Sequence, residues 1–364
     1  MARKKAPDFI LFIVTLALIT IGVVMVFSAS QVAALQDFND SYYFLKRQLL
    51  WALIGIGAML VIMRIDYWRY REFILPFLLV SFVLLVLVLV PGIGKVVNGA
   101  RRWIDLKFTS FQPSELMKIA LIFYTAHGLA TKQQHVRSFT RGMLPFLLVM
   151  AAACVLILAQ PDLGTAVSLA GTVYFMLLAA GARWSHLAGV AGAGLAAVAA
   201  AIAASDYRRE RFLAFLNPWK DPSDTGFHII QSLYALGSGG LFGVGLGRSH
   251  QKFLYLPERH TDFIFAIIGE ELGFLGVMVV LALFFLLIWR GYTIALKAPD
   301  TFSSLLVVGF TSMIAIQVII NVGVVTGSLP VTGIPLPLIS YGGTSLTFTL
   351  MGMGVILNVS RHCR

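Results

Sequence analysis

The sequence is poor in charged residues. Of its 364 residues, 12% are Asp, Glu, Lys or Arg, whereas 58% are hydrophobic. Soluble domains usually carry about 25% charged residues. These proportions exclude a soluble globular enzyme, a disordered protein and an ordinary nucleic-acid-binding domain. The net charge of +11 therefore points to lipid headgroups or to an anionic substrate carried by a lipid.

Cysteines and the spacings of common ligand sites are also scarce. The only two cysteines, Cys154 and Cys363, stand in an apolar run and beside the last residue, so no disulfide framework is expected. The sequence has no CxxC or Cys/His spacing for a structural metal and no DxD metal motif. The glycine-rich stretch 237–247 lacks the GxGxxG spacing, and no strand is expected before it, which excludes a Rossmann nucleotide site.

Long apolar runs are abundant instead. Ten of them approach the length of about 20 residues that a membrane-spanning helix needs, and they are too long for barrel strands. The ten runs are 9–30, 48–63, 73–90, 114–130, 142–159, 163–180, 187–205, 263–289, 302–326 and 341–358. We expect an all-α polytopic membrane protein with ten transmembrane helices, forming a single membrane domain over residues 1–364.

The basic residues predict the orientation of this domain. An even number of spans puts both termini on one side. If that side is the cytoplasm, 14 of the 28 Lys and Arg residues fall in 52 cytoplasmic residues and 13 fall in 114 external residues. The positive-inside rule favours this arrangement. The basic residues 3–5 precede the first run, which we expect to act as an uncleaved targeting signal.

One run is unusual in composition. Residues 187–205 are almost entirely Ala, Gly and Val. Small residues let helices approach closely, but they also give a helix little grip on its neighbours. The segment is therefore expected to be either a tightly packed helix or a mobile helix that gates the substrate.

The first polar cluster inside a run is FQPSELMK, residues 111–118. Pro113 suits the first turn of a helix. Glu115 would lie in that first turn, and Lys118 would lie three residues further on the same face. The two side chains are expected either to neutralise each other as an ion pair or to line a water-filled cavity open to the outside.

Two further external segments carry candidate groups. Arg101, Arg102 and Trp103 could serve as interfacial anchors, or the arginines could bind phosphate through their guanidinium groups. Asp162, in a short external turn, is expected to cap the next helix.

The long external loop 206–262 is the richest in polar residues, and we single out Asp262 at its end. Asp262 could simply cap the following helix. Alternatively, Arg259 and His260 could keep it ionised as a general base, although Glu258 and desolvation would raise its pKa. Glu270 and Glu271 follow in the next run as buried acids that must be paired or solvated.

The stretch 327–345 contains Pro330, Pro335 and Pro337 and no charged residue. Three prolines in eight residues prevent a regular helix. We expect an ordered re-entrant loop over the cavity that contributes shape rather than acid–base chemistry.

Taken together, these motifs resemble the SEDS family, which comprises the RodA, FtsW and SpoVE proteins. The resemblance runs from Pro7 onwards and is specific because six motifs occur in the same order. The motifs are NGARRWID (98–105), FQPSELMK (111–118), QPDLGTA (160–166), GSGGLFGVGLG (237–247), LPERHTDFIFAIIGEELGFLG (256–276) and PVTGIPLPLISYGGTS (330–345). The segments VFSAS (26–30) and TGSLPVTG (326–333) are more similar to the FtsW/SpoVE branch.

The resemblance implies a peptidoglycan glycosyltransferase that polymerises lipid II at the outer face of the bacterial cytoplasmic membrane and releases undecaprenyl pyrophosphate. It implies a class B penicillin-binding protein as the transpeptidase partner, in elongation, division or sporulation. Whether a divalent cation such as Mg²⁺ or Mn²⁺ takes part is left open.

The resemblance also assigns candidate residues. Asp262 corresponds to the family's essential acid and is the expected catalytic base. Glu115 and Lys118 correspond to a polar pair lining the central cavity. Arg102, Arg209 and Arg211 correspond to basic external positions of the family. Together with candidates from the residues themselves, the expected substrate-binding residues are Arg102, Glu115, Lys118, Arg209, Arg211, Gln231, Lys252, Glu258, His260 and Thr261.

Two other functions remain alternatives. A lipid II flippase would use the ten spans and the Glu115–Lys118 pair, but the charges crowd the external face, and residues such as His127 on the other side look isolated. A non-catalytic scaffold for the penicillin-binding protein would not need Asp262.

Overall fold

The structure is a computed structural model that describes residues 5–97, 99–105, 110–252 and 256–363. Residues 3 and 4 of the basic N-terminal segment and Asn98 of the NGARRWID motif lie outside the described residues.

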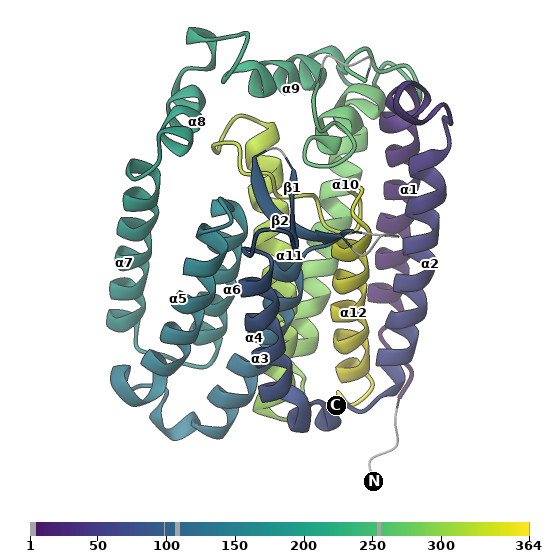
Figure 1. The fold of residues 1–364 in the computed structure, drawn as a ribbon. Helices are drawn as coiled ribbons and strands as arrows, with labels where there is room; N and C mark the ends of the chain where they lie inside the picture. Colours follow the sequence, from purple (N-terminus) through teal and green to yellow (C-terminus); the bar gives the residue numbers. More distant parts are fainter. Residues whose placement is uncertain (1–4, 98, 106–109, 253–255, 364) are drawn as a thin grey trace.

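All ten apolar segments form helices that run side by side (Figure 1). They are α1 (Phe9–Phe38), α2 (Tyr43–Arg64), α3 (Ile74–Leu87), α4 (Pro113–Thr131), α5 (Leu144–Leu158), α6 (Leu163–Ala179), α7 (Trp184–Ala203), α10 (Ile264–Leu296), α11 (Thr301–Val325) and α12 (Gly343–Ser360). Short helical turns adjoin them at η1 (Tyr67–Phe73), η2 (Gln133–His135) and η3 (Phe139–Met143).

Eight helices of the described chain are long and apolar enough to cross a membrane, with α3 and α5 counted together with η1 and η3. The 17-residue α6 is a shorter apolar helix, and α4, which carries the Glu115–Lys118 pair, is not among the eight. The molecule is therefore a helical, polytopic membrane protein.

Several helices are longer than their apolar runs. Helix α1 continues to Phe38 instead of ending at residue 30, and α10 continues to Leu296 instead of residue 289. Backbone hydrogen bonding carries a helix past the point at which its side chains cease to be uniformly apolar. Hydropathy alone therefore places the ends of these two helices too early.

Helices α11 and α12 form the centre of the molecule. In their most apolar stretches, 78% and 72% of the residues are buried inside the protein. Helix α11 packs against α4, α6 and α10, while α12 packs mainly against α2.

Helix α7 lies at the edge of the bundle (Figure 1). Leu187 is its one buried residue, and open space surrounds the α-carbons of Gly189, Gly192 and Gly194. The interpretation of its small residues as a tight packing surface is therefore wrong within the described structure. Its role as a gate remains a prediction.

The two ends of the described chain meet at one end of the bundle, which we call the terminal end. The amide of Lys5 donates to the carbonyl of Arg361 at 3.0 Å, and the amide of Asp8 donates to Oγ of Ser360 at 3.0 Å. We call the opposite end, which carries residues 206–252 and 256–262, the loop end (Figure 1).

The all-α expectation needs one correction, because the segment before α4 forms a small antiparallel sheet. Its strands are β1 (Gly94–Val97), β2 (Ala100–Asp105) and β3 (Ser110–Phe111), in the order β1-β2-β3. The NGARRWID motif supplies β2, so Arg101 and Arg102 are held on a strand rather than in a flexible loop.

The long loop at the loop end is partly helical. It contains α8 (Asp206–Leu216), η4 (Pro218–Lys220) and α9 (Phe227–Ser238). Helix α9 packs on α10 and α11, and Oγ of Ser232 donates to the carbonyl of Val325 at 2.9 Å. The loop is thus part of the folded domain.

The glycine-rich stretch has a structural role in this loop. Helix α10 is broken at Gly273, whose backbone is not helical (φ 66°, ψ −169°). The amides of Val244 and Gly245 donate to the carbonyls of Glu270 and Glu271 at 3.0 and 3.1 Å, so the stretch fills the break. A Cβ at position 243 would lie 2.2 Å from the Glu271 carbonyl oxygen, which explains the glycine there.

Candidate functional site

Asp262 lies at the loop end, immediately before α10. The helix begins at Ile264 with Phe263 as its N-cap residue, and no side chain caps it. The interpretation of Asp262 as a helix cap is therefore wrong. Its half-buried carboxyl group is left for another role.

The backbone around Asp262 is held by α11 and by the uncharged loop that follows it. Nδ2 of Asn321 on α11 donates to the carbonyl oxygen of Asp262 at 2.7 Å. Oγ of Ser340 donates to the carbonyl of Thr261 at 2.5 Å, and the amide of Tyr341 donates to the carbonyl of His260 at 2.9 Å. The loop between α11 and α12, residues 326–342, thus shapes the site without contributing a charge.

The electrostatic surroundings of Asp262 are mixed. Burial raises the pKa of its carboxyl group to about 7, and the neighbouring carboxylates of Glu258 and Asp162 add to this rise. Arg102 and Arg211 oppose the rise in pKa because a nearby cation favours the ionised form. A carboxyl group with a pKa close to neutral can take up a proton during a reaction and release it again.

Arg102 is fixed beside Asp262 by the turn between α5 and α6. Its Nε donates to the carbonyl of Gln160 at 3.0 Å, and its Nη2 donates to the carbonyl of Pro161. Its Nη1 lies 4.0 Å from Oδ2 of Asp162. These contacts leave the guanidinium group pre-oriented at the site.

Asp162 itself confirms the capping prediction. Its side chain accepts a hydrogen bond from the amide of Thr165 at 3.0 Å and from the hydroxyl of the same residue at 2.9 Å.

Arg211 is the second cation near Asp262. Its guanidinium stacks on the ring of Tyr207, with Cζ 4.5 Å from the ring centroid. Burial lowers the pKa of Arg211, with Arg102 acting in the same direction and Asp262 in the opposite one. An arginine keeps its charge through such shifts.

The remaining basic candidates of α8 lie differently. Arg209 forms an exposed ion pair with Asp206 at 3.2 Å. Arg208 donates to the carbonyls of Ala201 and Leu158 at 3.0 Å each, so it anchors α8. Gln231 is half-buried on α9.

Arg259 and His260 are not the cations that act on Asp262, which corrects the sequence-based expectation. Nε of Arg259 donates to the carbonyl of Ala29 at 3.2 Å. The ring of His260 packs against Phe44, with 4.5 Å between centroids, and burial lowers its pKa to about 4. At neutral pH this histidine carries no charge.

Glu258 and Thr261 lie together in the same loop. The hydroxyl of Thr261 donates to Oε2 of Glu258 at 2.7 Å. Glu258 is exposed and adopts a positive φ of 50°. The hydrogen bond therefore orients a carboxylate that acts on the pKa of Asp262.

Glu115 and Lys118 form the predicted intrahelical ion pair at the start of α4. Nζ of Lys118 lies 2.7 Å from Oε1 of Glu115, and the side chains are 5% and 6% exposed. Pro113 occupies the first turn, as its position in the sequence predicts.

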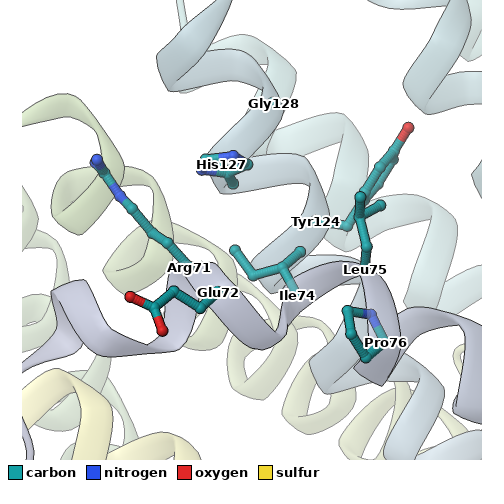
Figure 2. A pocket seen from close by; sticks show the side chains of 8 residues that line it. All are labelled: Arg71, Glu72, Ile74, Leu75, Pro76, Tyr124, His127 and Gly128. Atoms are coloured by element: carbon teal, nitrogen blue, oxygen red, sulfur yellow. The ribbon is translucent and has the colours of Figure 1, made fainter.

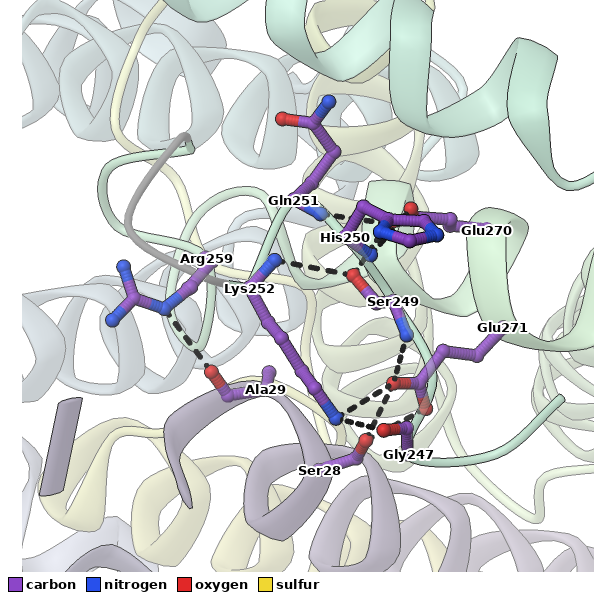
Figure 3. A network of polar contacts seen from close by, with 10 residues as sticks. All are labelled: Ser28, Ala29, Gly247, Ser249, His250, Gln251, Lys252, Arg259, Glu270 and Glu271. Atoms are coloured by element: carbon purple, nitrogen blue, oxygen red, sulfur yellow. Dashed lines mark hydrogen bonds and ion pairs between the residues drawn. The ribbon is translucent and has the colours of Figure 1, made fainter. Parts of the chain in front are cut away.

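Lys252 lies in a separate network with the two buried acids of α10 (Figure 3). Its Nζ is 3.7 Å from Oε1 of Glu271, which also accepts a hydrogen bond from Oγ of Ser28 at 2.6 Å. Glu270 accepts hydrogen bonds from Ser249 Oγ and, at 2.8 Å, from the amide of His250. Of the two acids, which were predicted to be paired or solvated, Glu271 is paired with a cation and Glu270 is held by hydrogen bonds. The network ties α1 and the glycine-rich loop to α10.

A cavity of about 250 Å³ lies between η1, α3 and α4 (Figure 2). Its polar lining residues are Arg71, Glu72 and His127. The Arg71 guanidinium stacks on Trp68, and the His127 ring packs edge-on to Phe302, 6.0 Å between centroids. His127 therefore packs on an aromatic ring, and its buried Nδ1 has no hydrogen-bond partner among the described residues.

Sequence reasoning missed two residues of the site, Asn321 and Gly333. A Cβ at Gly333 would lie 3.4 Å from Oδ2 of Asp262 and 4.0 Å from Nη1 of Arg102, so this glycine borders both groups. Asn321 could have been found from its sequence, because an amide inside an apolar run must find a buried partner.

Within the described residues, no three His, Cys, Asp or Glu side chains are grouped as a metal site.

Comparisons with known proteins agree with this architecture. A family model described as "cell cycle protein", FtsW/RodA/SpoVE, matches residues 9–364. The chain is 53% identical to stage V sporulation protein E of Bacillus subtilis, with 100% of this chain and 99% of the relative covered. It is 48% identical to the probable peptidoglycan glycosyltransferase FtsW of Geobacter metallireducens, with 98% and 95% covered.

Solved structures give the same result. A peptidoglycan synthase complex, described as coordinating polymerization and crosslinking, contains a chain with a TM-score of 0.81, 34% identity and 98% of both chains covered. The rod shape determining protein RodA of Thermus thermophilus matches with a TM-score of 0.73, 32% identity and the same coverage.

Proposed function

The chain belongs to the FtsW/RodA/SpoVE family of cell cycle proteins, and on this premise we propose that it is a peptidoglycan glycosyltransferase. It polymerises lipid II into glycan strands and releases undecaprenyl pyrophosphate. The observation that carries the proposal is Asp262, a carboxyl group with a pKa of about 7 that caps no helix and has two arginines nearby.

The proposed placement has ten spans, a single domain, both termini in the cytoplasm and the loop end outside the bacterial cytoplasmic membrane. The excess of basic residues in the short loops of the terminal end supports this orientation. Asp262 then faces the compartment in which the cell wall is built.

The chemistry is a single displacement at the anomeric carbon of the donor sugar. The acceptor hydroxyl oxygen forms the new bond to that carbon, and the bond from the carbon to the pyrophosphate oxygen breaks. Asp262 takes the hydroxyl proton as general base. Arg102 and Arg211 stabilise the negative charge that collects on the departing pyrophosphate.

The other candidates take supporting roles. Glu258, oriented by Thr261, adds to the rise in the pKa of Asp262 that burial causes. His260 contributes a neutral ring, and the buried Glu115–Lys118 pair at the start of α4 remains a substrate-binding candidate. Three further residues remain substrate-binding candidates. They are Arg209 on α8, Gln231 on α9 and Lys252, which contacts Glu271 of α10.

A divalent cation would add charge compensation for the pyrophosphate. Polymerisation measured with a chelator and then with Mg²⁺ or Mn²⁺ restored tests whether the reaction needs one.

The proposed partner is a class B penicillin-binding protein that crosslinks the strands. The structural likeness to a chain of a synthase complex that polymerises and crosslinks supports such a pairing.

A direct test uses the purified protein, its partner with the transpeptidase blocked, and labelled lipid II. We expect the wild type to make glycan strands and Asp262→Asn to make none. Asp224→Asn, an exposed acid of the same loop, is the matched control and should retain full activity. Polymerisation by Asp262→Asn at the wild-type rate would contradict the assignment of the base.

The two alternative functions give different results. A scaffold would show no polymerisation even as wild type. A flippase would move lipid II across liposomes without making strands, and Glu115→Ala rather than Asp262→Asn would stop the movement.

A further inference from the structure

Asn321 makes an unusual pair of contacts within α11. It is 1% exposed, and its Nδ2 donates to two carbonyl oxygens, Asp262 at 2.7 Å and Ile334 at 2.8 Å. Two carbonyl acceptors can be satisfied only by the amide NH₂ group, so the orientation of the amide follows from its partners. Its Oδ1 is buried and has no hydrogen-bond partner among the described residues.

The two carbonyls belong to segments that lie far apart in the chain. One belongs to Asp262 itself. The other follows Gly333, whose α-carbon borders Oδ2 of Asp262 and Nη1 of Arg102. We call the backbone of Gly333 and Ile334 the Gly333 wall. The single buried amide of Asn321 therefore holds both the backbone of Asp262 and the Gly333 wall that faces its carboxyl group.

We propose that Asn321 is a positioning residue of the glycosyltransferase site: its amide fixes the Asp262 carboxyl group relative to the Gly333 wall. Asn321 does not touch the substrate. The inference rests on the proposed function, because it concerns how precisely the base meets the acceptor hydroxyl.

Removal of this amide should lower the catalytic rate more than the affinity for the substrate. Without the two donors, the carbonyls of Asp262 and Ile334 must move to find new partners, since buried unsatisfied carbonyls are costly. A displacement of about 1 Å at a reacting group can cost about 100-fold in rate. Arg102 and Arg211, which hold the pyrophosphate in the proposed reaction, are anchored elsewhere, so substrate binding should change little.

The experiment compares Asn321→Leu with Gln317→Leu in the polymerisation assay with labelled lipid II. Leucine has the same number and branching of side-chain heavy atoms as asparagine, and it lacks both donors. Gln317 is a buried amide one helical turn earlier on α11, so its variant controls for the loss of a buried polar group from this helix. Thermal unfolding of each purified variant reports on folding.

For Asn321→Leu we expect kcat to fall by about 10- to 100-fold, with KM changed by less than about threefold. The acidic limb of the pH–rate profile should move to lower pH than in the wild type. A displaced Gly333 backbone admits water to the Asp262 carboxyl group, and hydration lowers the pKa of that group. Gln317→Leu should keep kcat and the pH profile of the wild type.

Two results would overturn the inference. One is a kcat for Asn321→Leu within twofold of wild type. The other is an equal fall in kcat in both variants that parallels their fall in thermal stability. That result would show that the Asn321 amide has only a structural role. A wild-type protein that makes no strands would instead refute the proposed function, so the two failures are distinguishable.

Discussion

The α-carbon of Gly333 borders the carboxyl group of Asp262, with 3.4 Å between Oδ2 and the position a Cβ would take. Gly333 also has a φ of +71°, which residues with a side chain rarely adopt. The wall of the site is therefore made of bare backbone, which leaves space for a hydroxyl group beside the acid.

Gly333→Ala should lower the polymerisation rate by at least about 10-fold, because an alanine is strained at this positive φ and the backbone that borders Asp262 must shift. The rate with labelled lipid II checks this. Gly342→Ala is the control in the same loop, since φ there is 170° and the nearest atom to the new methyl would be 3.7 Å away. Equal rates for both variants would contradict the importance of this wall.

The reaction should depend on the ionisation of Asp262. Its pKa of about 7 predicts that kcat/KM rises with pH and levels off above about pH 7. Arg211→Gln removes a cation that lowers this pKa, so the acidic limb should move to higher pH. Glu258→Gln removes a carboxylate that raises it, so the limb should move to lower pH. Limbs that stay in place in both variants would show that another group controls the profile.

The stability of the protein should also depend on pH through Asp262. The folded-state pKa of Asp262 lies above its ordinary value of 3.8, so the folded protein binds the proton more tightly than the unfolded chain. Wild type therefore loses stability as pH rises from about 4 to about 7 through this group. Asp262→Asn has no titrating group at this position and does not lose stability in this way. The Tm of the variant minus the Tm of the wild type should therefore increase between about pH 4 and about pH 7 and stay constant at higher pH. An advantage independent of pH would contradict the raised pKa.

The Lys252 network should matter for folding. Lys252→Met leaves the buried Glu271 carboxylate without its cation, and breaking one partner of a buried pair costs about 3–5 kcal/mol. The double variant with Glu271→Gln should recover part of this loss, because the glutamine needs no counter-charge. Chemical or thermal unfolding of both variants measures the difference, and a double variant less stable than Lys252→Met would argue against the pairing.

Local spacing made several features predictable. The Glu115–Lys118 ion pair and the capping of α6 by Asp162 connect residues three apart, so the helix period alone brings them together. The ten helices follow in the same way from the length of the apolar runs, although their ends do not.

The cations around Asp262 were not predictable in this way. Arg259 and His260 are adjacent in sequence, but the backbone turns them toward Ala29 and Phe44. Arg102 and Arg211 arrive from a β-strand and from α8, which no local pattern places beside the start of α10.

By itself, the sequence determined a helical membrane protein, the family motifs and the acid Asp262 that is central to the chemistry. Composition reports the fit of a segment to a bilayer, and residue spacing reports short-range helix geometry. Only the tertiary structure decided that Asp262 caps no helix, that Arg102 and Arg211 accompany it, and that Asn321 holds it. Those contacts join segments separated by about 50 to 160 residues, and their formation depends on how the helices pack around α11.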